Sequence, residues 1–472
     1  MQGNGSMVHY KQLLQPIFPN SQESVIQWLA ACAIIILIPL SMWNPKFLAF
    51  LLLPFLLFGL CLVIKYPAFL FMVFVASSAL EGGFVSEVRT ITLTRLSFLL
   101  FSFSFVFNAL RLSSWRKLNE DPLWVFFALW IVFYALSFLW TANQELAADK
   151  LRELLLIMGV CTMGYLVFRK ASLFEYKMFI AVYVAGTIAL MTFMYTHIGD
   201  IILIGQLSER TAQRVTPFSA NSYGRAIMVA VMALLSLSLF AKRKLASFLF
   251  TAIFTAAALG MIVIAGSRSS VVIFFVSLCM MFLLHEYLSR FLLLRKYTFY
   301  FLLFVTLVGF SLFLTVNYLP ENLSLRIVNL FSQTSEVIET NPRVELYKKS
   351  LDLINDAPFL GGGISGFYSY MESYPHNLLL EITLESGALG LFLFLCFFLI
   401  FLFRMVSSMK IAYNRDKDSF GIFFSFCFMT IAAWLYTLFI GELTGHRIVY
   451  FLTALLLALD YRVKETLIHH NQ

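Results

Sequence analysis

Residues 374–390 have the sequence YPHNLLLEITLESGALG, and an apolar run continues from Leu389 to Phe403. An uninterrupted apolar run of this length is typical of a membrane-spanning helix, whereas barrel strands alternate apolar and polar side chains. The stretch puts the imidazole of His376 at the mouth of that helix and the carboxylates of Glu381 and Glu385 on its first turns. It therefore predicts a membrane helix that carries polar chemistry at one end.

The composition indicates the same class of protein. The 472-residue chain is 60% hydrophobic and 13% charged, against about 25% charged residues in an ordinary soluble domain. A soluble protein could not bury so much apolar surface, and the 52 phenylalanines suit helices that face lipid. No polar stretch is long enough to form a separate soluble core. We expect an all-α polytopic membrane protein.

The apolar segments can be assigned along the whole chain. About fourteen of them approach the roughly 20 residues that a helix needs to cross the hydrocarbon core. They are 25–43, 46–64, 66–80, 96–110, 122–140, 151–168, 174–197, 222–241, 246–265, 270–285, 298–317, 377–403, 419–440 and 446–463. Because 66–80 and 96–110 are short, we expect about 12–14 transmembrane helices.

The predicted organisation has five parts. They are a cytoplasmic N-terminal tail (1–24), transmembrane helices (25–317), a large periplasmic loop with an amphipathic helix (318–376), further transmembrane helices (377–463) and a cytoplasmic C-terminal tail (464–472). Residues 1–6 are interpreted as an addition before a native start at Met7.

Lysine and arginine are concentrated in alternate loops, which by the positive-inside rule are cytoplasmic. These basic loops lie at 111–117, 169–177, 242–244, 290–296, 404–417 and 462–464. Both termini fall on that side of the membrane. The net charge of +8 therefore indicates topology and contact with anionic lipid, and no nucleic-acid partner is expected.

The opposite face collects a second set of basic residues. They are Arg210, Arg214, Arg268, Arg343 and His376. An arginine near a helix end commonly extends to the membrane interface, and this interpretation stays open for each of them. Arg225 lies about one turn inside a predicted helix, where a charge is costly unless it is paired or faces a wet cavity.

The segment 266–270, Gly-Ser-Arg-Ser-Ser, joins two long apolar helices by a tight turn with Arg268 at its tip. Gly266 permits the turn, and Ser269 or Ser270 is expected to cap the next helix. Free amides at a helix start together with a guanidinium form an anion site. The turn therefore predicts a site for an anionic group.

The 318–376 loop is expected to be folded. Asn341-Pro342 predicts a helix start, and apolar residues then recur at helical spacing at Val344, Tyr347, Leu351 and Ile354. The pattern predicts an amphipathic helix on the membrane surface, with Arg343 in its first turn. Pro358 ends it, and the glycines at 361–363 allow the backbone to turn sharply. A scaffold that only covers the helices is the alternative interpretation.

Metal and disulfide chemistry are not predicted. Cysteines stand at 32, 61, 161, 279, 396 and 427, all within apolar segments, and no two form a close pair. No Asp-x-Asp or Glu-x-Asp pair occurs in the outer loops, so a metal held by clustered carboxylates is not expected there.

Several groups of residues resemble the core of the O-antigen polymerase and O-antigen ligase superfamily. In chain order they are Arg343-x3-Tyr347-x3-Ser350, then Asp356-Ala-Pro358-Phe-Leu-Gly361-Gly-Gly363-x2-Gly366-Phe367, then Pro375-His376-Asn377-x2-Leu380-x4-Glu385-x-Gly387-x2-Gly390. Upstream, 266–269 is similar to the family's Ser-Arg element, and 214–221 to its Arg-to-Asn segment before a membrane helix. Ala220 departs from the proline that the family often has there. The first 200 residues match only in being hydrophobic.

The resemblance implies a glycosyltransferase of the periplasmic face of the bacterial inner membrane. Its substrates would be a glycan linked to undecaprenyl diphosphate and a hydroxyl acceptor, with no metal and no cofactor. Arginines would neutralise the diphosphate through paired hydrogen bonds: Arg214 and Arg268 in the catalytic site, with Arg343, Arg210 and Arg225 as further diphosphate-binding candidates. His376 would contact the reacting hydroxyl as a general base or an orienting group. Asn377, Glu381 and Glu385 would support it.

Two reactions fit this resemblance. A polymerase joins lipid-linked repeat units, and a ligase moves the finished glycan to lipid A core or to a protein hydroxyl. The length and helix number favour the polymerase, and a chain-length regulator protein is a partner that the sequence leaves open. A lipid-linked glycan transporter is the alternative from another class, although no repeated half with matching broken helices is found.

Overall fold

The computed structural model describes residues 66–81, 93–109, 122–196, 220–240, 244–264, 267–289, 342–371, 374–415, 417–440 and 443–470. In these ranges the regular structure consists of twelve α-helices and two short 3-10 helices, and it includes no strand. The prediction of an all-α protein is therefore confirmed. The predicted segments 25–43, 46–64 and 298–317 lie outside the described residues.

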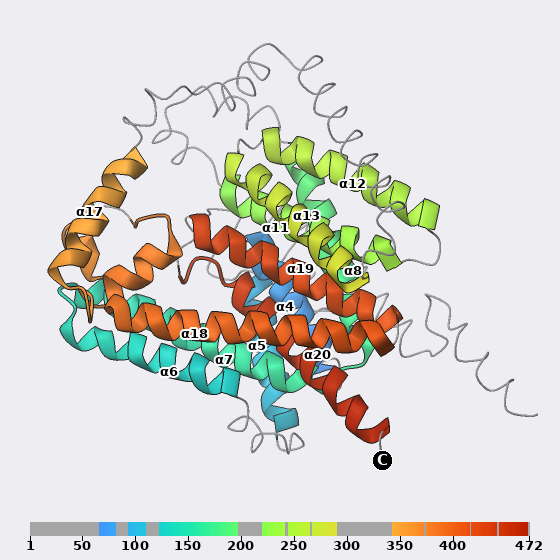
Figure 1. Ribbon diagram of the computed structural model, residues 1–472, viewed down its shortest axis with the longest axis horizontal. Helices are drawn as coiled ribbons and strands as arrows, with labels where there is room; N and C mark the ends of the chain where they lie inside the picture. Colours follow the sequence, from blue (N-terminus) through green and yellow to red (C-terminus); the bar gives the residue numbers. More distant parts are fainter. Residues whose placement is uncertain are drawn as a thin grey trace, which may run out of the picture.

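The helices follow the predicted order. They are α4 (Pro67–Glu81), α5 (Leu93–Ala109), α6 (Pro122–Leu136), α7 (Gln144–Phe168), α8 (Leu173–Thr196), α11 (Ala220–Phe240), α12 (Lys244–Ile264), α13 (Arg268–Ser289), α17 (Pro342–Asp356), α18 (Leu378–Arg415), α19 (Lys417–Ile440) and α20 (Ile448–His470). Most lie side by side as a bundle, while the short α17 stands at one end, on the left of Figure 1. The C-terminus lies at the other end.

Several helices can cross a membrane. Six described helices have the length and apolar composition for it, and four shorter apolar helices accompany them. Large apolar side chains such as Leu139, Ile253 and Phe403 are exposed, as expected where lipid replaces water. The protein is thus a multi-pass membrane protein.

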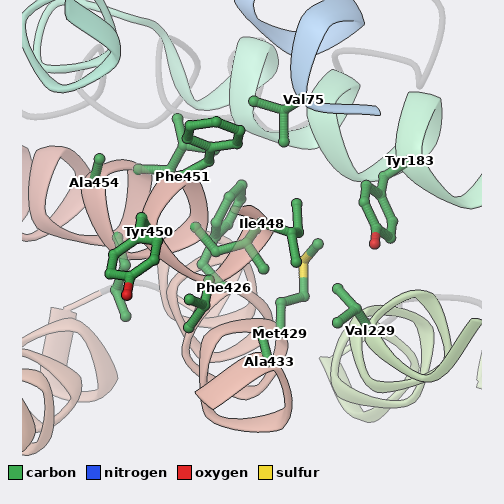
Figure 2. Packing of buried hydrophobic residues seen from close by; sticks show 14 of the residues in the cluster. Val75, Tyr183, Val229, Phe426, Met429, Ala433, Ile448, Tyr450, Phe451 and Ala454 are labelled. Atoms are coloured by element: carbon green, nitrogen blue, oxygen red, sulfur yellow. The ribbon is translucent and has the colours of Figure 1, made fainter. Parts of the chain in front are cut away.

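The core of the bundle is formed by α19, which packs against α11, α18 and α20. Its side chains Phe426, Met429 and Ala433 meet Val229 of α11 and Phe451 of α20 (Figure 2). Aromatic rings fill much of this core, and the Phe71 and Phe101 rings have centroids 5.0 Å apart. Such ring pairs add packing energy beyond the area that they bury.

Three predicted boundaries differ from the structure. The segment 377–403 was expected to end before Arg404, but α18 continues through the basic residues to Arg415 because it packs beside α20. The segment 122–140 ends its α-helix at Leu136 and continues as a 3-10 turn over Ser137–Trp140. The helix α13 begins at Arg268, so Ser269 and Ser270 lie within its first turn instead of capping it.

At the end of the bundle where α18 finishes, Asp460 joins two helices. This buried carboxylate of α20 accepts from Arg404 and Ser408 of α18, and Lys464 Nζ lies 3.0 Å from its Oδ1. The cluster ties α18 to α20 far from the residues predicted to act on a substrate.

Candidate functional site

The helix α18 is broken near its start. Gly387 has φ +64° and ψ −166°, so Leu378–Ser386 and Ala388–Arg415 are two helical pieces. The segment 358–363 enters the break and takes up the exposed backbone groups. Ala388 N donates to Pro358 O at 2.8 Å, and Gly362 N donates to Leu384 O at 2.8 Å. A helix break inside a membrane protein is tolerated where such bonds satisfy the backbone.

Gly387 is required by this geometry. A Cβ there would lie 2.2 Å from Phe359 O, and the positive φ disfavours any side chain. Gly361, also at positive φ, packs as closely against the backbone of residues 385–387 from the other side. Gly361 and Gly387 therefore allow two backbone segments to contact each other directly. In the sequence this requirement appears only as a glycine motif.

We expect Gly387→Ala to lower the thermal midpoint of the protein strongly, because the Cβ collides with backbone and adds about 1–3 kcal/mol of conformational strain. Gly362→Ala is the matched control, since its Cβ would have only an ordinary contact of 3.7 Å and its φ is not positive. Thermal unfolding in detergent measures both. Equal midpoints for the two variants would contradict this account of the break.

A buried ion cluster holds the broken helix to α7. Lys150 Nζ lies 2.5 Å from Glu381 Oε1 and 2.8 Å from Glu385 Oε1. Both carboxylates are fully buried and Lys150 is nearly so. The cluster is also bonded to backbone: Glu385 Oε1 accepts from Ser365 N at 2.7 Å, and Glu381 Oε2 accepts from Leu443 N at 3.0 Å.

These contacts give Glu381 and Glu385 a definite place. They join α7, the loop at Ser365 and the turn at 443–447 around the first piece of α18. Glu381 and Glu385 therefore hold the loop and the helix start together. Lys150 was missed, because in the sequence it is one lysine near a predicted helix start.

His376 and Asn377 begin α18. Asn377 is the N-cap, with its Oδ1 accepting from Leu379 N at 3.0 Å and Leu380 N at 3.1 Å. His376 has a left-handed φ of 52°, which is costly for a residue that is not glycine. Its ring centroid lies 4.1 Å from that of Tyr374. Backbone strain of this kind is common at functional sites, and it fixes the imidazole at the mouth of the helix.

Arg225, the sixth residue of α11, lies in the same region. It is 4% exposed, and its Nη1 has no hydrogen-bond partner in the described part of the chain. No described carboxylate forms an ion pair with it. Tyr436 of α19 and Tyr374, whose ring contacts that of His376, lie close enough to interact electrostatically with Arg225.

The Ser-Arg turn lies directly beside Arg225. Ser267 and Ser270 hydroxyls are 2.6 Å apart, and Ser270 Oγ donates to the Tyr436 hydroxyl at 3.3 Å. A Cβ on Gly224 would lie 2.0 Å from Ser270 Oγ, so only glycine lets α11 and α13 approach this closely. The start of α13, with Arg268 as its first residue, is therefore packed against the start of α11.

A second imidazole completes the region. His446, in the turn between α19 and α20, has its ring centroid 5.8 Å from that of Tyr436. Its Nδ1 lies 3.3 Å from Thr437 Oγ1. Burial and the positive charge of Arg225 lower the pKa of His446 well below its usual value. Sequence reasoning missed this residue, because a single histidine in a five-residue turn carries no motif.

The structure thus assembles part of the predicted set. The Ser267 and Ser270 hydroxyls of the Ser-Arg turn lie within 3.5 Å of the Tyr436 hydroxyl. Arg225 interacts electrostatically with Tyr436 and with Tyr374, whose ring contacts that of His376. Arg343 is the second residue of α17. Arg210 and Arg214 lie outside the described residues. Within the described ranges, no group of three or more His, Cys, Asp or Glu side chains could hold a metal ion.

Residues 253–395 match the family model described as O-antigen ligase. The matched segment includes α13, α17 and the broken start of α18, which supply much of the region described above. No curated protein matches the sequence closely enough to count as a relative.

Proposed function

We propose that the protein transfers a glycan from undecaprenyl diphosphate to a hydroxyl acceptor, because residues 253–395 match the family model described as O-antigen ligase. Members of this family are glycosyltransferase-like enzymes. The proposed reaction takes place at the periplasmic face of the bacterial inner membrane and needs neither a metal nor another cofactor.

Arg225 is the observation that carries this proposal. A buried guanidinium without a carboxylate partner costs several kcal/mol in a membrane protein. An anionic ligand would offset that cost, and the adjacent amides at the start of α13 favour an anion as well. A lipid diphosphate supplies concentrated negative charge at the membrane surface, which is where the proposal puts these groups.

The other basic residues have roles in the same scheme. Arg268 binds the diphosphate from the start of α13, and Arg214, Arg210 and Arg343 are proposed to close around it from the outer segments. Arginine suits this task because its planar guanidinium binds phosphate oxygens through two parallel hydrogen bonds.

The bond changes follow from this arrangement. The acceptor hydroxyl oxygen attacks the anomeric carbon of the donor sugar, and the carbon–oxygen bond to the diphosphate breaks. The diphosphate keeps the electron pair and is stabilised by the arginines. His376 accepts the proton of the attacking hydroxyl, in the role of general base.

Polymerisation of lipid-linked repeat units is the proposed reaction, supported by the length of the chain and its many helices. The ligase reaction is the second candidate, favoured by the description of the matched family. A chain-length regulator would be an additional partner of a polymerase but not of a ligase.

Reconstitution into liposomes tests the proposal. The donor is lipid-linked glycan extracted from source cells that lack this chain, supplied alone or with lipid A core. We expect longer lipid-linked glycans without lipid A core, and undiminished activity in EDTA because arginines neutralise the diphosphate. Product on lipid A core alone would identify the ligase instead.

His376→Ala is expected to reduce transfer by about 10²–10⁴-fold, the usual contribution of a general base. Arg268→Lys, which keeps the charge and loses the two-point contact, is expected to impair transfer strongly as well. Full activity of a correctly inserted His376→Ala protein, or a strict requirement for Mg²⁺ or Mn²⁺, would contradict the mechanism.

A further inference from the structure

The hydroxyl of Thr437 determines which ring nitrogen of His446 carries the proton. Thr437 Oγ1 donates its only hydrogen to Ala433 O at 2.9 Å. Toward His446 Nδ1, 3.3 Å away, the hydroxyl can therefore only accept. Nδ1 must carry a proton, and in the neutral ring this leaves Nε2 unprotonated, with its lone pair directed away from α19.

The ring is held in this state by its surroundings. Burial of the ring and the nearby charge of Arg225 both disfavour a positive charge on His446, and the Tyr436 ring of α19 packs beside it. The turn itself is anchored to α7, where Arg447 Nη2 lies 2.6 Å from Glu153 Oε1. In the described part of the chain, no group forms a hydrogen bond to Nε2, and the residue is half-buried.

The neutral Nε2 of His446 and the buried guanidinium of Arg225 favour different ligand atoms. A diphosphate at neutral pH offers only acceptor oxygens, which the guanidinium binds and the Nε2 lone pair repels. A sugar hydroxyl can donate to Nε2. The two side chains are therefore complementary to a hydroxyl lying next to a phosphate.

We propose that His446 is a second ligand-binding imidazole of the site, whose Nε2 accepts a hydrogen bond from a glycan hydroxyl. This inference rests on the proposed function for the identity of the ligand. It gives the turn 443–447 a part in glycan recognition, and it separates recognition of the sugar by His446 from proton transfer by His376.

The first test is independent of activity. Nitrogen NMR of protein labelled in its histidine rings, with His446→Phe to assign the signal, should show the neutral tautomer protonated at Nδ1 at neutral pH. Thr437→Val, which removes the accepting oxygen, should change that signal, whereas Thr437→Ser should preserve it. An imidazolium, or a neutral ring protonated at Nε2, would overturn the proposal.

The second test uses two lipids that differ in their sugar. His446→Phe keeps a ring against Tyr436 and removes both nitrogens. It should reduce turnover of the extracted lipid-linked glycan by about 3- to 10-fold, the usual effect of one hydrogen bond, and leave binding of sugar-free undecaprenyl diphosphate unchanged. Wild-type turnover in this variant, or an equal loss of binding for both lipids, would overturn the proposal.

Failure of the His446 proposal can be distinguished from failure of the proposed function. If the wild-type protein transfers no glycan at all, the proposed function is wrong while the NMR result still reports the His446 tautomer. If His446→Phe does not fold, Thr437→Val against Thr437→Ser gives the same comparison, with lower turnover expected only for the valine variant.

Discussion

Lys150→Met is expected to lower the free energy of unfolding by about 3–5 kcal/mol, because it leaves two carboxylates buried without their cation. Lys150 Nζ forms an ion pair with both Glu381 and Glu385, 2.5 Å and 2.8 Å away. Equilibrium unfolding in mixed detergent measures the change. The effect should extend to activity, since the cluster holds the broken start of α18, with its His376, against α7.

Combined substitutions distinguish the effect of unpaired charges on stability from the effect of lost packing. Lys150→Met together with Glu381→Gln and Glu385→Gln should recover much of the lost stability, since the amides can still accept from Ser365 N and Leu443 N. The control is Arg447→Met, which breaks the exposed pair with Glu153 and should change stability by about 0–1 kcal/mol. A Lys150→Met protein as stable as the wild type would show that the cluster does not clamp the helix.

Arg225→Met is expected to act in opposite directions on stability and on ligand binding. The unliganded protein should unfold at an equal or higher temperature, because an uncompensated buried charge has been removed. Binding of undecaprenyl diphosphate should weaken by about 10- to 100-fold, since a charge-assisted contact contributes roughly 1.5–3 kcal/mol.

Thermal unfolding with and without undecaprenyl diphosphate measures both effects. The lipid should raise the midpoint of the wild-type protein by mass action and leave that of Arg225→Met nearly unchanged. Arg152→Met is the matched control, because Arg152 is exposed and pairs with Asp149 on α7. Equal stabilisation of the Arg225→Met and wild-type proteins by the lipid would exclude Arg225 from the diphosphate site.

Much of the fold could be predicted because it depends on local composition. A continuous apolar run forms a helix in lipid whatever its neighbours are, since no other structure satisfies its backbone. The helix α17 begins at Pro342 for an equally local reason, the fixed φ of proline at a first helical position. Boundaries failed where packing extended a helix, as in α18 beyond Arg404.

The candidate site was predictable only where a motif marked it. His376, Asn377 and the Ser-Arg turn stand in patterns whose spacing resembles a family. Arg225 was visible as a charge inside an apolar segment, because such a charge needs a partner or a wet cavity. Lys150 and His446 had no such signal, since each is an isolated residue whose partners lie far away in the chain.

The sequence by itself determined that the chain forms apolar helices, where most of them begin, and which polar residues gather near their ends. The tertiary structure alone decided which of those ends meet. It joined Lys150 to Glu385 across 235 positions, and it buried Arg225 with no carboxylate paired to it among the described residues. Helix formation depends on neighbouring residues, whereas the pairing of buried charges depends on contacts between distant segments, because only the folded chain brings the partners together.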